Sequence, residues 1–191
     1  LPRPVQDSYA IYDPSRHSHA VVSRKGHFFA IELVHPKTGD PLPLDTIEDQ
    51  LQQCLQLAES KSSTLPKLGI LTSNDRDSWA EAREELLYLG GAEMGEALDL
   101  LQSGAVMVNL DEELPKSRTE CGELFLSGGM KSGGNRWFDK SIQLIVAENG
   151  KSAALCEHSM MDGMPCVNYA GYITNSTYEE VKKRSKESNK A

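Results

Sequence analysis

The sequence HAVVSRKGHFFAIELV, residues 19–34, places two apolar runs on either side of a Lys-Gly pair. Val, Ile and Phe are typical of strands, and glycine tolerates the positive φ that a tight turn requires. The two runs therefore predict a β-hairpin that turns at Lys25-Gly26. Residues 1–18 are rich in Pro, Asp and Ser without a clean period, so we expect an extended connector before the hairpin.

Helix and strand patterns are mixed along the rest of the chain. Residues 45–60, 75–89 and 93–102 carry apolar side chains at helical spacing, and Asp45 with Glu48 resembles a capping box at the first of these helices. Strands mixed with helices indicate an α/β fold, with a mixed β-sheet and helices packed on it. A short helix is also expected just before a glycine-rich stretch, residues 128–134. The apolar runs that we predict to be strands are 68–72, 105–110, 141–147 and 152–156.

Composition limits the class of protein. A chain of 191 residues with 39% hydrophobic content can bury one sizeable core, so we expect one domain over residues 19–175 and a polar tail over 176–191. A formal net charge of −8 argues against nucleic acid as a partner, because phosphate backbones are held by clustered Lys and Arg. The sequence contains no apolar run of about 18 residues, so no membrane span is expected.

The four cysteines are scattered and form no C-x-x-C pair. A chain of this length does not depend on disulfides to hold its core, and their absence is typical of a reducing compartment. We therefore expect an intracellular protein.

The segment EHSMMDGMP, residues 157–165, follows directly on the strand predicted to end at Cys156. A neutral imidazole held in a site that excludes water can take a proton from a hydroxyl near neutral pH, so His158 is a candidate general base. Asp162 can tie the turn down through an ion pair, and Gly163 permits a backbone conformation that larger residues resist. Taken alone, the pattern fits two interpretations equally well: an active-site loop, and a surface turn that carries a histidine by chance.

Three segments together make the pattern specific: LGILTSNDRDSWA at 68–80, GNRWFDK at 134–140 and EHSMMDG at 157–163. They have the order and spacing of the choline/carnitine O-acyltransferases, and the resemblance runs from about residue 17 to about residue 173. The last segment also resembles the active-site motif of the coenzyme A-dependent acyltransferases, which include chloramphenicol acetyltransferase. Its Met-Met-Asp-Gly form is most similar to fungal carnitine acetyltransferases.

The resemblance implies a fold, a reaction and a site. It implies a partial catalytic domain of the chloramphenicol acetyltransferase-like type over residues 19–175. The implied enzyme is a short-chain (acetyl) carnitine O-acyltransferase of fatty acid metabolism, in which His158 deprotonates the carnitine hydroxyl for direct attack on the thioester. Asp162 and Gly163 would support the catalytic loop. Acyl-coenzyme A would be a co-substrate, and no bound cofactor or metal is implied.

Departures from the family pattern accompany these matches. Family enzymes are longer, and their coenzyme A-contacting lysines, carnitine-contacting residues and Ser-Thr-Ser oxyanion element lie downstream of the histidine. The coenzyme A-binding residues are therefore unknown for this chain, and we expect the remainder of a longer enzyme as a partner. Family members occur in the cytosol, mitochondria and peroxisomes, so the motifs do not select a compartment. The alternative function is a catalytically incompetent fragment that acts as a fold or interaction module.

The segment at residues 135–140 has two interpretations. Trp137 and Phe138 are suited to anchoring the core, with Arg136 and Asp139 as a buried or half-buried pair that fixes the segment. The alternative is direct support of the catalytic loop.

Cys156 lies two residues before His158, so on a strand both side chains would share a face and could form a nucleophile and its base. An activated thiolate needs an electropositive setting, whereas Glu157 supplies a negative charge, so a buried and inert cysteine is favoured.

Three other motifs resemble sites but lack part of the required pattern. His17 and His19 form a His-x-His pair with no third metal ligand at suitable spacing. The glycine-rich stretch 128–134 lacks the Lys-Ser/Thr ending of a phosphate-binding loop. A basic cluster in the tail, residues 182–186, stands among Glu179, Glu180 and Glu187 and is typical of a solvated helix face.

Overall fold

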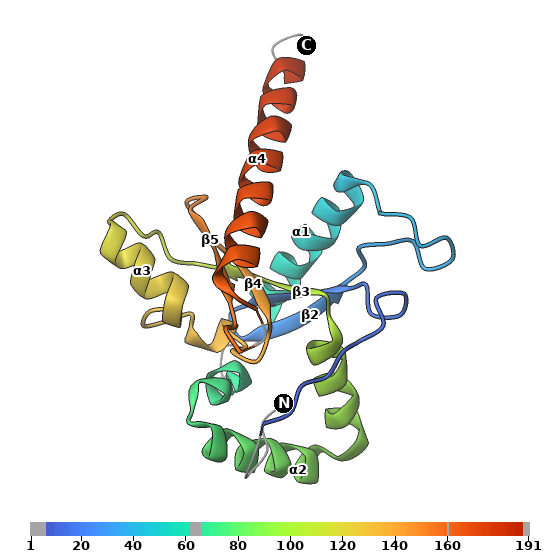
Figure 1. The fold of residues 1–191 in the computed structure, drawn as a ribbon, viewed down its shortest axis with the longest axis vertical. Helices are drawn as coiled ribbons and strands as arrows, with labels where there is room; N and C mark the ends of the chain where they lie inside the picture. Colours follow the sequence, from blue (N-terminus) through green and yellow to red (C-terminus); the bar gives the residue numbers. More distant parts are fainter. Residues whose placement is uncertain (1–6, 62–65, 160, 189–191) are drawn as a thin grey trace.

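The computed structural model describes residues 7–61, 66–159 and 161–188, and its centre is a five-stranded mixed sheet (Figure 1). The strand order is β2-β1-β3-β4-β5. The mixed α/β class predicted from the sequence is confirmed. The strands are β1 (Ala20–Arg24), β2 (His27–Ile31), β3 (Val106–Asp111), β4 (Ile142–Ala147) and β5 (Ser152–Cys156).

The predicted hairpin forms β1 and β2, which pair antiparallel with Arg24 opposite His27. The two turn residues between them have positive φ, 55° at Lys25 and 79° at Gly26. Positive φ at both positions matches the right-handed twist of the flanking strands, and this fixes the register of the hairpin.

The directions of the strands determine what lies at each edge of the sheet. β1, β3 and β4 are parallel to one another, whereas β5 runs antiparallel to β4 with Cys156 opposite Ile142. The N-terminal ends of β1, β3 and β4 and the C-terminal end of β5 therefore lie at the same edge of the sheet. The loop that leaves β5 lies at this edge.

Four α-helices surround the sheet in the described part of the chain, and α1 and α2 begin and end close to the predicted bounds. The two predicted helices at 75–89 and 93–102 are the arms of α2, which bends at Gly91. The capping box expected at Asp45 is not formed, because α1 begins one residue earlier. A capping box that we did not predict, Ser117 with Glu120, starts the third helix. The helices are α1 (Leu44–Ser60), α2 (Arg76–Ser103), α3 (Arg118–Ser127) and α4 (Gly163–Ser188), with 3₁₀ turns η1 (Leu68–Ser73) and η2 (Gly133–Asn135).

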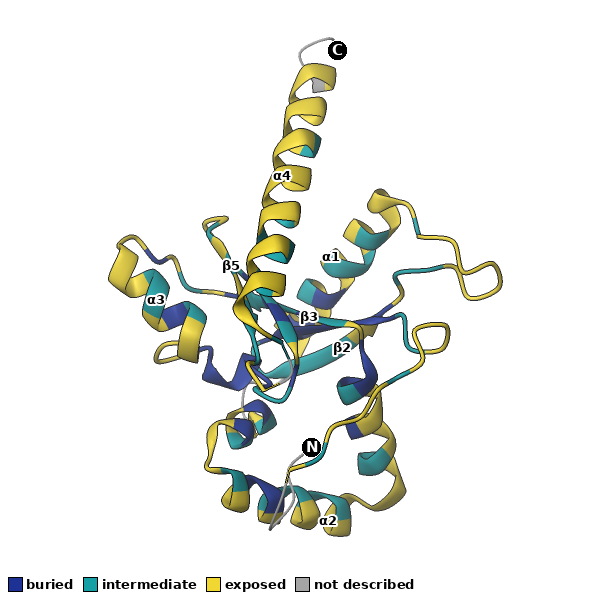
Figure 2. Cartoon of the chain, in the orientation of Figure 1, coloured by how far each residue is buried: buried dark blue, intermediate teal, exposed yellow. Residues whose placement is uncertain are grey.

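Helices pack on both faces of the sheet. Alternate β1 residues point to opposite faces, and all five are buried. α1 covers one face, where Cys54 packs with Ala20 and Val22. α2 covers the other, where Trp79 and its neighbours pack on Met107. Figure 2 shows the buried residues concentrated where these helices meet the sheet.

The prediction of a strand at residues 68–72 is wrong, because this segment forms the 3₁₀ turn η1. Gly69 lies directly against the backbone carbonyls of Gly134 and Arg136, leaving no room for a side chain. Thr72 then fixes the turn: its hydroxyl donates to the Gly69 carbonyl at 2.7 Å and accepts from the Phe138 N–H at 3.0 Å. A five-residue apolar run carries too little periodicity to distinguish these outcomes.

The last helix is longer than the sequence indicated. α4 runs without a break through the boundary predicted between residues 175 and 176, and it rises away from the sheet with an almost entirely exposed surface (Figures 1 and 2). Arg184 connects its distal half to α1 through Glu48 at 3.1 Å. The basic cluster at 182–186 is therefore on a solvated helix, as predicted. Within the described residues, no helix combines the length and the apolar character needed to cross a bilayer.

Candidate active site

The loop that carries His158 begins where β5 ends at Cys156, as predicted. Glu157 extends the pairing with one further backbone hydrogen bond, from its N–H to the Ser141 carbonyl at 3.0 Å. α4 begins at Gly163. His158 is thus held between a strand and a helix, at the edge of the sheet where β4 starts.

His158 and Asp162 face each other in solvent. The distance from His158 Nε2 to Asp162 Oδ1 is 3.8 Å, and the side chains are 82% and 88% exposed. Asp162 Oδ1 also accepts a hydrogen bond from the Gly163 N–H at 2.7 Å, directly before α4, where the helix dipole favours a negative charge. The two side chains are therefore close enough for the predicted ion pair, which forms only when the imidazole is protonated, and at this exposure solvent would screen it.

The neighbours of His158 fix the turn in a way that we did not predict. Ser159 donates twice to the Glu157 carboxylate, from its N–H to Oε1 at 2.9 Å and from its hydroxyl to Oε2 at 2.7 Å. The Glu-x-Ser spacing was the available signal for this closed turn. Glu157 therefore acts as a local hydrogen-bond acceptor on one side of the histidine.

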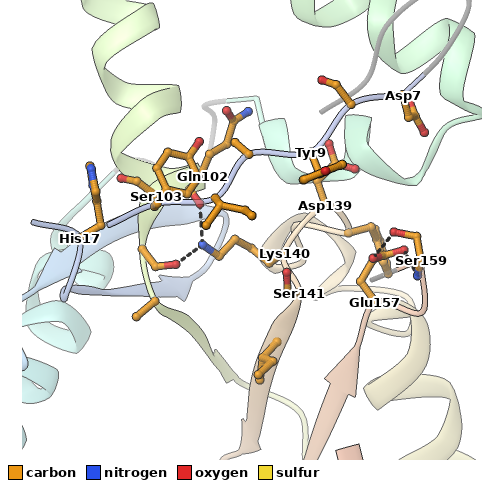
Figure 3. A pocket seen from close by; sticks show the side chains of 18 of the residues that line it. Asp7, Tyr9, His17, Gln102, Ser103, Asp139, Lys140, Ser141, Glu157 and Ser159 are labelled. Carbon is orange, nitrogen blue, oxygen red and sulfur yellow. Dashed lines mark hydrogen bonds between the residues drawn. The ribbon is translucent and has the colours of Figure 1, made fainter. Parts of the chain in front are cut away.

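A cavity of about 620 Å³ lies beside this loop (Figure 3). Glu157 and Ser159 both line it, so the residues on either side of His158 form part of its wall. The N-terminal segment from Asp7 to His17 crosses another side. The remaining walls come from Arg76 at the start of α2, residues 102–105 at its end, and residues 138–142 before and within β4.

Lys140 is buried and lines the cavity beside the C-terminal end of α2. Its amino group donates to the carbonyls of Leu101, Gln102 and Gly104, which are residues at the end of α2 and its cap. Figure 3 shows Lys140 reaching toward this end of the helix. Burial lowers the pKa of Lys140 to about 8. The free carbonyls at a helix C-terminus attract a cation, so Lys140 fixes the end of α2 at the sheet edge.

Asp139 faces the N-terminus of α2, and its predicted pairing with Arg136 is wrong. Its carboxylate accepts from Arg76 Nη1 at 2.6 Å and from Trp79 Nε1 at 2.8 Å. Arg76 also bonds to Asp7 in the N-terminal segment, with Nε and Oδ2 2.7 Å apart. Asp139 thus ties residues 134–140 to the helix that follows residues 68–75.

Arg136 pairs instead with Asp111 at the end of β3. Nη2 lies 2.6 Å from Oδ2 and Nη1 lies 3.1 Å from Oδ1, and both side chains are fully buried. Nη2 also donates to the Leu124 carbonyl of α3 at 2.7 Å. This two-point pair compensates two charges that would be costly to bury alone.

The aromatic residues of the same segment divide between core and cavity. Trp137 is a core anchor, as predicted: it is 1% exposed and packs edge-to-face on Trp79 with ring centroids 5.6 Å apart. Phe138 is only half-buried and lines the cavity. The segment therefore supports the core and also forms part of the wall beside the His158 loop.

Comparison with known proteins identifies the family. The family described as "Choline/Carnitine o-acyltransferase" matches residues 1–191. This chain belongs to the choline/carnitine O-acyltransferase family. The resemblance expected from the three sequence segments is thereby confirmed.

Individual choline/carnitine O-acyltransferases differ in acceptor and acyl group. The chain is 32% identical to carnitine O-acetyltransferase of Mus musculus over 186 residues, which are 93% of this chain and 29% of that protein. It is 34% identical over 171 residues to mitochondrial carnitine O-palmitoyltransferase 2 of Rattus norvegicus, covering 88% of this chain and 24% of that protein. It is 32% identical over 160 residues to choline O-acetyltransferase of Danio rerio, covering 81% of this chain and 24% of that protein. The chain thus spans less than a third of the length of each relative.

Burial, together with the influence of the Cys166 thiol, raises the pKa of Cys156 to about 11. Such a thiol holds little thiolate near neutral pH. This favours the inert interpretation of Cys156 over a nucleophile, although the residue is half-buried, not buried.

The other motifs that resembled sites have structural contacts. His17 packs edge-on against Tyr12, and His19 is buried with Nε2 2.8 Å from the Leu100 carbonyl. Across the described residues, no group of three or more His, Cys, Asp or Glu side chains is placed to hold a metal. In the glycine-rich stretch, Gly128 adopts a φ of 81° and ends α3, and residues 132–135 are buried.

Proposed function

We propose that this chain supplies the general base of a coenzyme A-dependent carnitine O-acyltransferase with a preference for short acyl groups. The observation that carries the proposal is the family match over the whole chain, with His158 in the loop that leaves β5. Glu157 and Ser159 place this loop on the wall of a cavity large enough for a small substrate.

The proposed reaction is a direct transfer. The neutral His158 imidazole takes the proton of the carnitine hydroxyl, and the oxygen attacks the thioester carbonyl of acyl-coenzyme A. The carbon–sulfur bond then breaks, and the coenzyme A thiolate leaves and takes the proton back from the imidazolium. Acyl-coenzyme A is a co-substrate, and the scheme uses no bound cofactor and no metal. Asp162 and Gly163 shape the loop that presents the imidazole.

The His158 side chain is too exposed for a site that excludes water. General base catalysis on a thioester is most effective where water is excluded, whereas the His158 side chain is 82% exposed. We propose that further protein, the remainder of a longer enzyme, packs against the loop and closes the site. The length of the relatives, of which this chain covers 24% to 29%, supports this view.

We also propose a chloramphenicol acetyltransferase-like fold and an intracellular location. The sheet with helices on both faces, and a candidate base in a loop at its edge, support the fold type. The four cysteines all lie within the described residues, and all four are free, which supports a reducing compartment.

An acyl-transfer assay tests the reaction in the longest natural protein that contains this sequence. Release of the coenzyme A thiol is followed with acetyl- or palmitoyl-coenzyme A as donor and carnitine or choline as acceptor. We expect acetyl-coenzyme A with carnitine to react fastest. A faster reaction with palmitoyl-coenzyme A or with choline would contradict the proposed acyl group or acceptor. Absence of thiol release with every pair would favour the alternative, a fold or interaction module without activity.

Calorimetry of the 191-residue chain with acetyl-coenzyme A tests whether this chain alone contains the coenzyme A site. We expect weak binding or none, because the sequence of residues 157–165 includes no Lys or Arg that could hold the phosphates of coenzyme A. A dissociation constant in the low micromolar range, equivalent to about −8 kcal/mol, would show that the chain binds coenzyme A without further protein.

A further inference from the structure

The segment from Asp7 to His17 separates the cavity from solvent. It runs across the cavity with Asp7 at one end and His17 at the other (Figure 3). Residues 9–11 line the cavity and are also exposed, so this wall is only one chain thick. The other walls belong to the folded body: the two ends of α2, the residues around the start of β4 and the loop after β5. A displacement of the segment therefore changes access to the cavity.

The C-terminal end of the segment is anchored in the core through His19, which is 8% exposed. Its Nε2 lies 2.8 Å from the Leu100 carbonyl oxygen, and its own carbonyl accepts a hydrogen bond from the Ala105 N–H at 2.9 Å. A turn at residues 13–17, closed by two backbone hydrogen bonds to the Asp13 carbonyl, leads into this anchor. This end of the segment is therefore fixed to the body.

An exposed ion pair joins the N-terminal end to α2. Asp7 Oδ2 lies 2.7 Å from Arg76 Nε, and the two side chains are 45% and 42% exposed. Arg76 Nη1 also lies 2.6 Å from Asp139, whose side chain is only 9% exposed. Arg76 therefore keeps its buried partner when Asp7 moves away, and the outer contact is easily broken because solvent screens it.

The middle of the segment has no backbone support of its own. Residues 9–12 form no backbone hydrogen bond with any other residue that the structure describes. Two attachments, the fixed one at His19 and the exposed one at Asp7, are therefore the contacts that set its position over the cavity.

We infer that residues 7–17 are a strap that closes the cavity and opens at the contact between Asp7 and Arg76, with His19 as the fixed end. In the closed position the strap keeps the cavity apart from solvent. In the open position the cavity admits a small substrate beside the loop that carries His158. The admission of a substrate rests on the proposed function, whereas the opening of the strap does not.

The charges of the ion pair make the opening sensitive to salt. A higher ionic strength weakens an exposed ion pair, so the open fraction should rise with salt concentration. Asp7→Asn removes one charge and leaves Arg76 paired with Asp139, so it should open the strap at low salt as well. Asp7→Glu keeps the carboxylate and should keep the strap closed.

Thiol labelling inside the cavity of the 191-residue chain provides the test. Ser103 lines the cavity and is 6% exposed, so Ser103→Cys places a thiol behind the strap. The rate of its reaction with iodoacetamide is followed by mass spectrometry. Trypsin releases position 103 in a peptide of residues 84–116, which contains none of the four natural cysteines. Cys121 on α3 is released separately, in residues 119–131, and is the internal control.

We expect Asp7→Asn to speed labelling at position 103 about two- to fivefold at low salt, the range that corresponds to one exposed ion pair. Asp7→Glu should label at the original rate, and all three chains should approach one rate at about 1 M salt. Asp7→Asn should add nothing in a chain that carries Arg76→Gln, because the two substitutions break the same contact. Labelling of Cys121 should be the same throughout.

Equal labelling rates at position 103 in the original and the Asp7→Asn chains would overturn the inference. A parallel rise at Cys121 would also overturn it, because the substitution would then loosen the whole chain. Gln102→Cys, in the same peptide and on the same wall, repeats the measurement if Ser103→Cys disturbs the fold. None of these rates depends on turnover, so a failure of the strap leaves His158 as the proposed base, and a failure of the proposed reaction leaves the labelling unchanged.

Discussion

Arg136 and Asp111 form a buried ion pair at the end of β3, and we expect the stability of the fold to depend on it. Both side chains are fully buried, and each compensates the charge of the other through two contacts. Asn135 adds a further hydrogen bond, from Nδ2 to Asp111 at 3.0 Å. The pair joins the end of β3 to the segment before β4, and so it fixes the part of the chain that forms the cavity wall.

Removal of one member of this pair should be costly. Asp111→Asn leaves the Arg136 charge buried without a counter-charge, so we expect the free energy of unfolding to fall by about 3–5 kcal/mol. Urea unfolding measures the change. Arg184→Ala, which breaks the exposed ion pairs of Arg184 with Glu180 on α4 and with Glu48 on α1, is the control and should change stability little. A loss no larger for Asp111→Asn than for Arg184→Ala would contradict the importance of the buried pair.

The partner of Arg136 illustrates what a single sequence does not reveal. Asp139 was predicted because it is near in sequence, whereas Asp111 is 25 residues away and is brought close only by the pairing of β3 with β4. The strand at 105–110 was readable, but the contact of Asp111 across strands was not. The position of His158 at a strand end followed from local pattern, whereas its exposure depends on what packs around the loop.

At the scale of elements, α2 depends on one glycine. Gly91 has φ of 57° and ψ of −144°, a conformation open essentially to glycine alone, and it joins the two arms of the helix. Gly95, four residues later, has normal helical geometry and room for a side chain, since the nearest atom is 3.9 Å from a Cβ placed there.

These two glycines should respond to alanine in opposite directions. Gly91→Ala should lower the free energy of unfolding by about 1–3 kcal/mol because the bend becomes strained. Gly95→Ala should raise it by about 0.4–1 kcal/mol because alanine favours the helix and restricts the unfolded chain. Thermal unfolding followed by circular dichroism measures both. Equal effects of the two substitutions would show that the bend at Gly91 is not required.

Lys140 makes the end of α2 sensitive to pH. Its pKa is about 8 in the folded chain, against 10.5 for a free side chain, so the unfolded chain binds more protons between these values. Stability therefore rises with pH across that window, by up to about 3 kcal/mol. Comparison with Lys140→Met isolates this effect, because the other titrating groups are common to both proteins.

We expect the stability of the original chain relative to Lys140→Met to increase between about pH 8 and about pH 10.5 in urea unfolding. A relative stability that falls as pH rises would mean that the helix carbonyls favour the ammonium by more than burial disfavours it.

Most elements could be predicted because their apolar residues repeat with a clear period. The hairpin, α1, both arms of α2 and the strands β3 to β5 are of this kind. The prediction of a strand at 68–72 was wrong because this short segment, with Leu68, Ile70 and Leu71, fits a buried strand equally well, and only its contact with residues 134–136 selects the 3₁₀ turn. The length of α4 was underestimated because its first residues, from Gly163, were interpreted as the end of the loop that carries His158.

At the scale of the whole molecule, the central feature is an exposed histidine on a well-fixed edge of the sheet. Strand pairing, the Glu157–Ser159 turn and the start of α4 position the loop, while the imidazole itself remains open to solvent. This arrangement suits a base that works once further protein covers it.

The substitution His158→Ala, made in the longest natural protein that contains this sequence, tests the central claim most directly. Turnover of acetyl-coenzyme A and carnitine should fall roughly 10²- to 10⁴-fold, the usual loss for a general base, while the binding of both substrates changes far less. His35→Ala, which alters an exposed histidine in the turn after β2, is the matched control and should keep full turnover. Near-normal turnover in His158→Ala, or an acyl group trapped on Cys156, would contradict the assignment of His158 as the base.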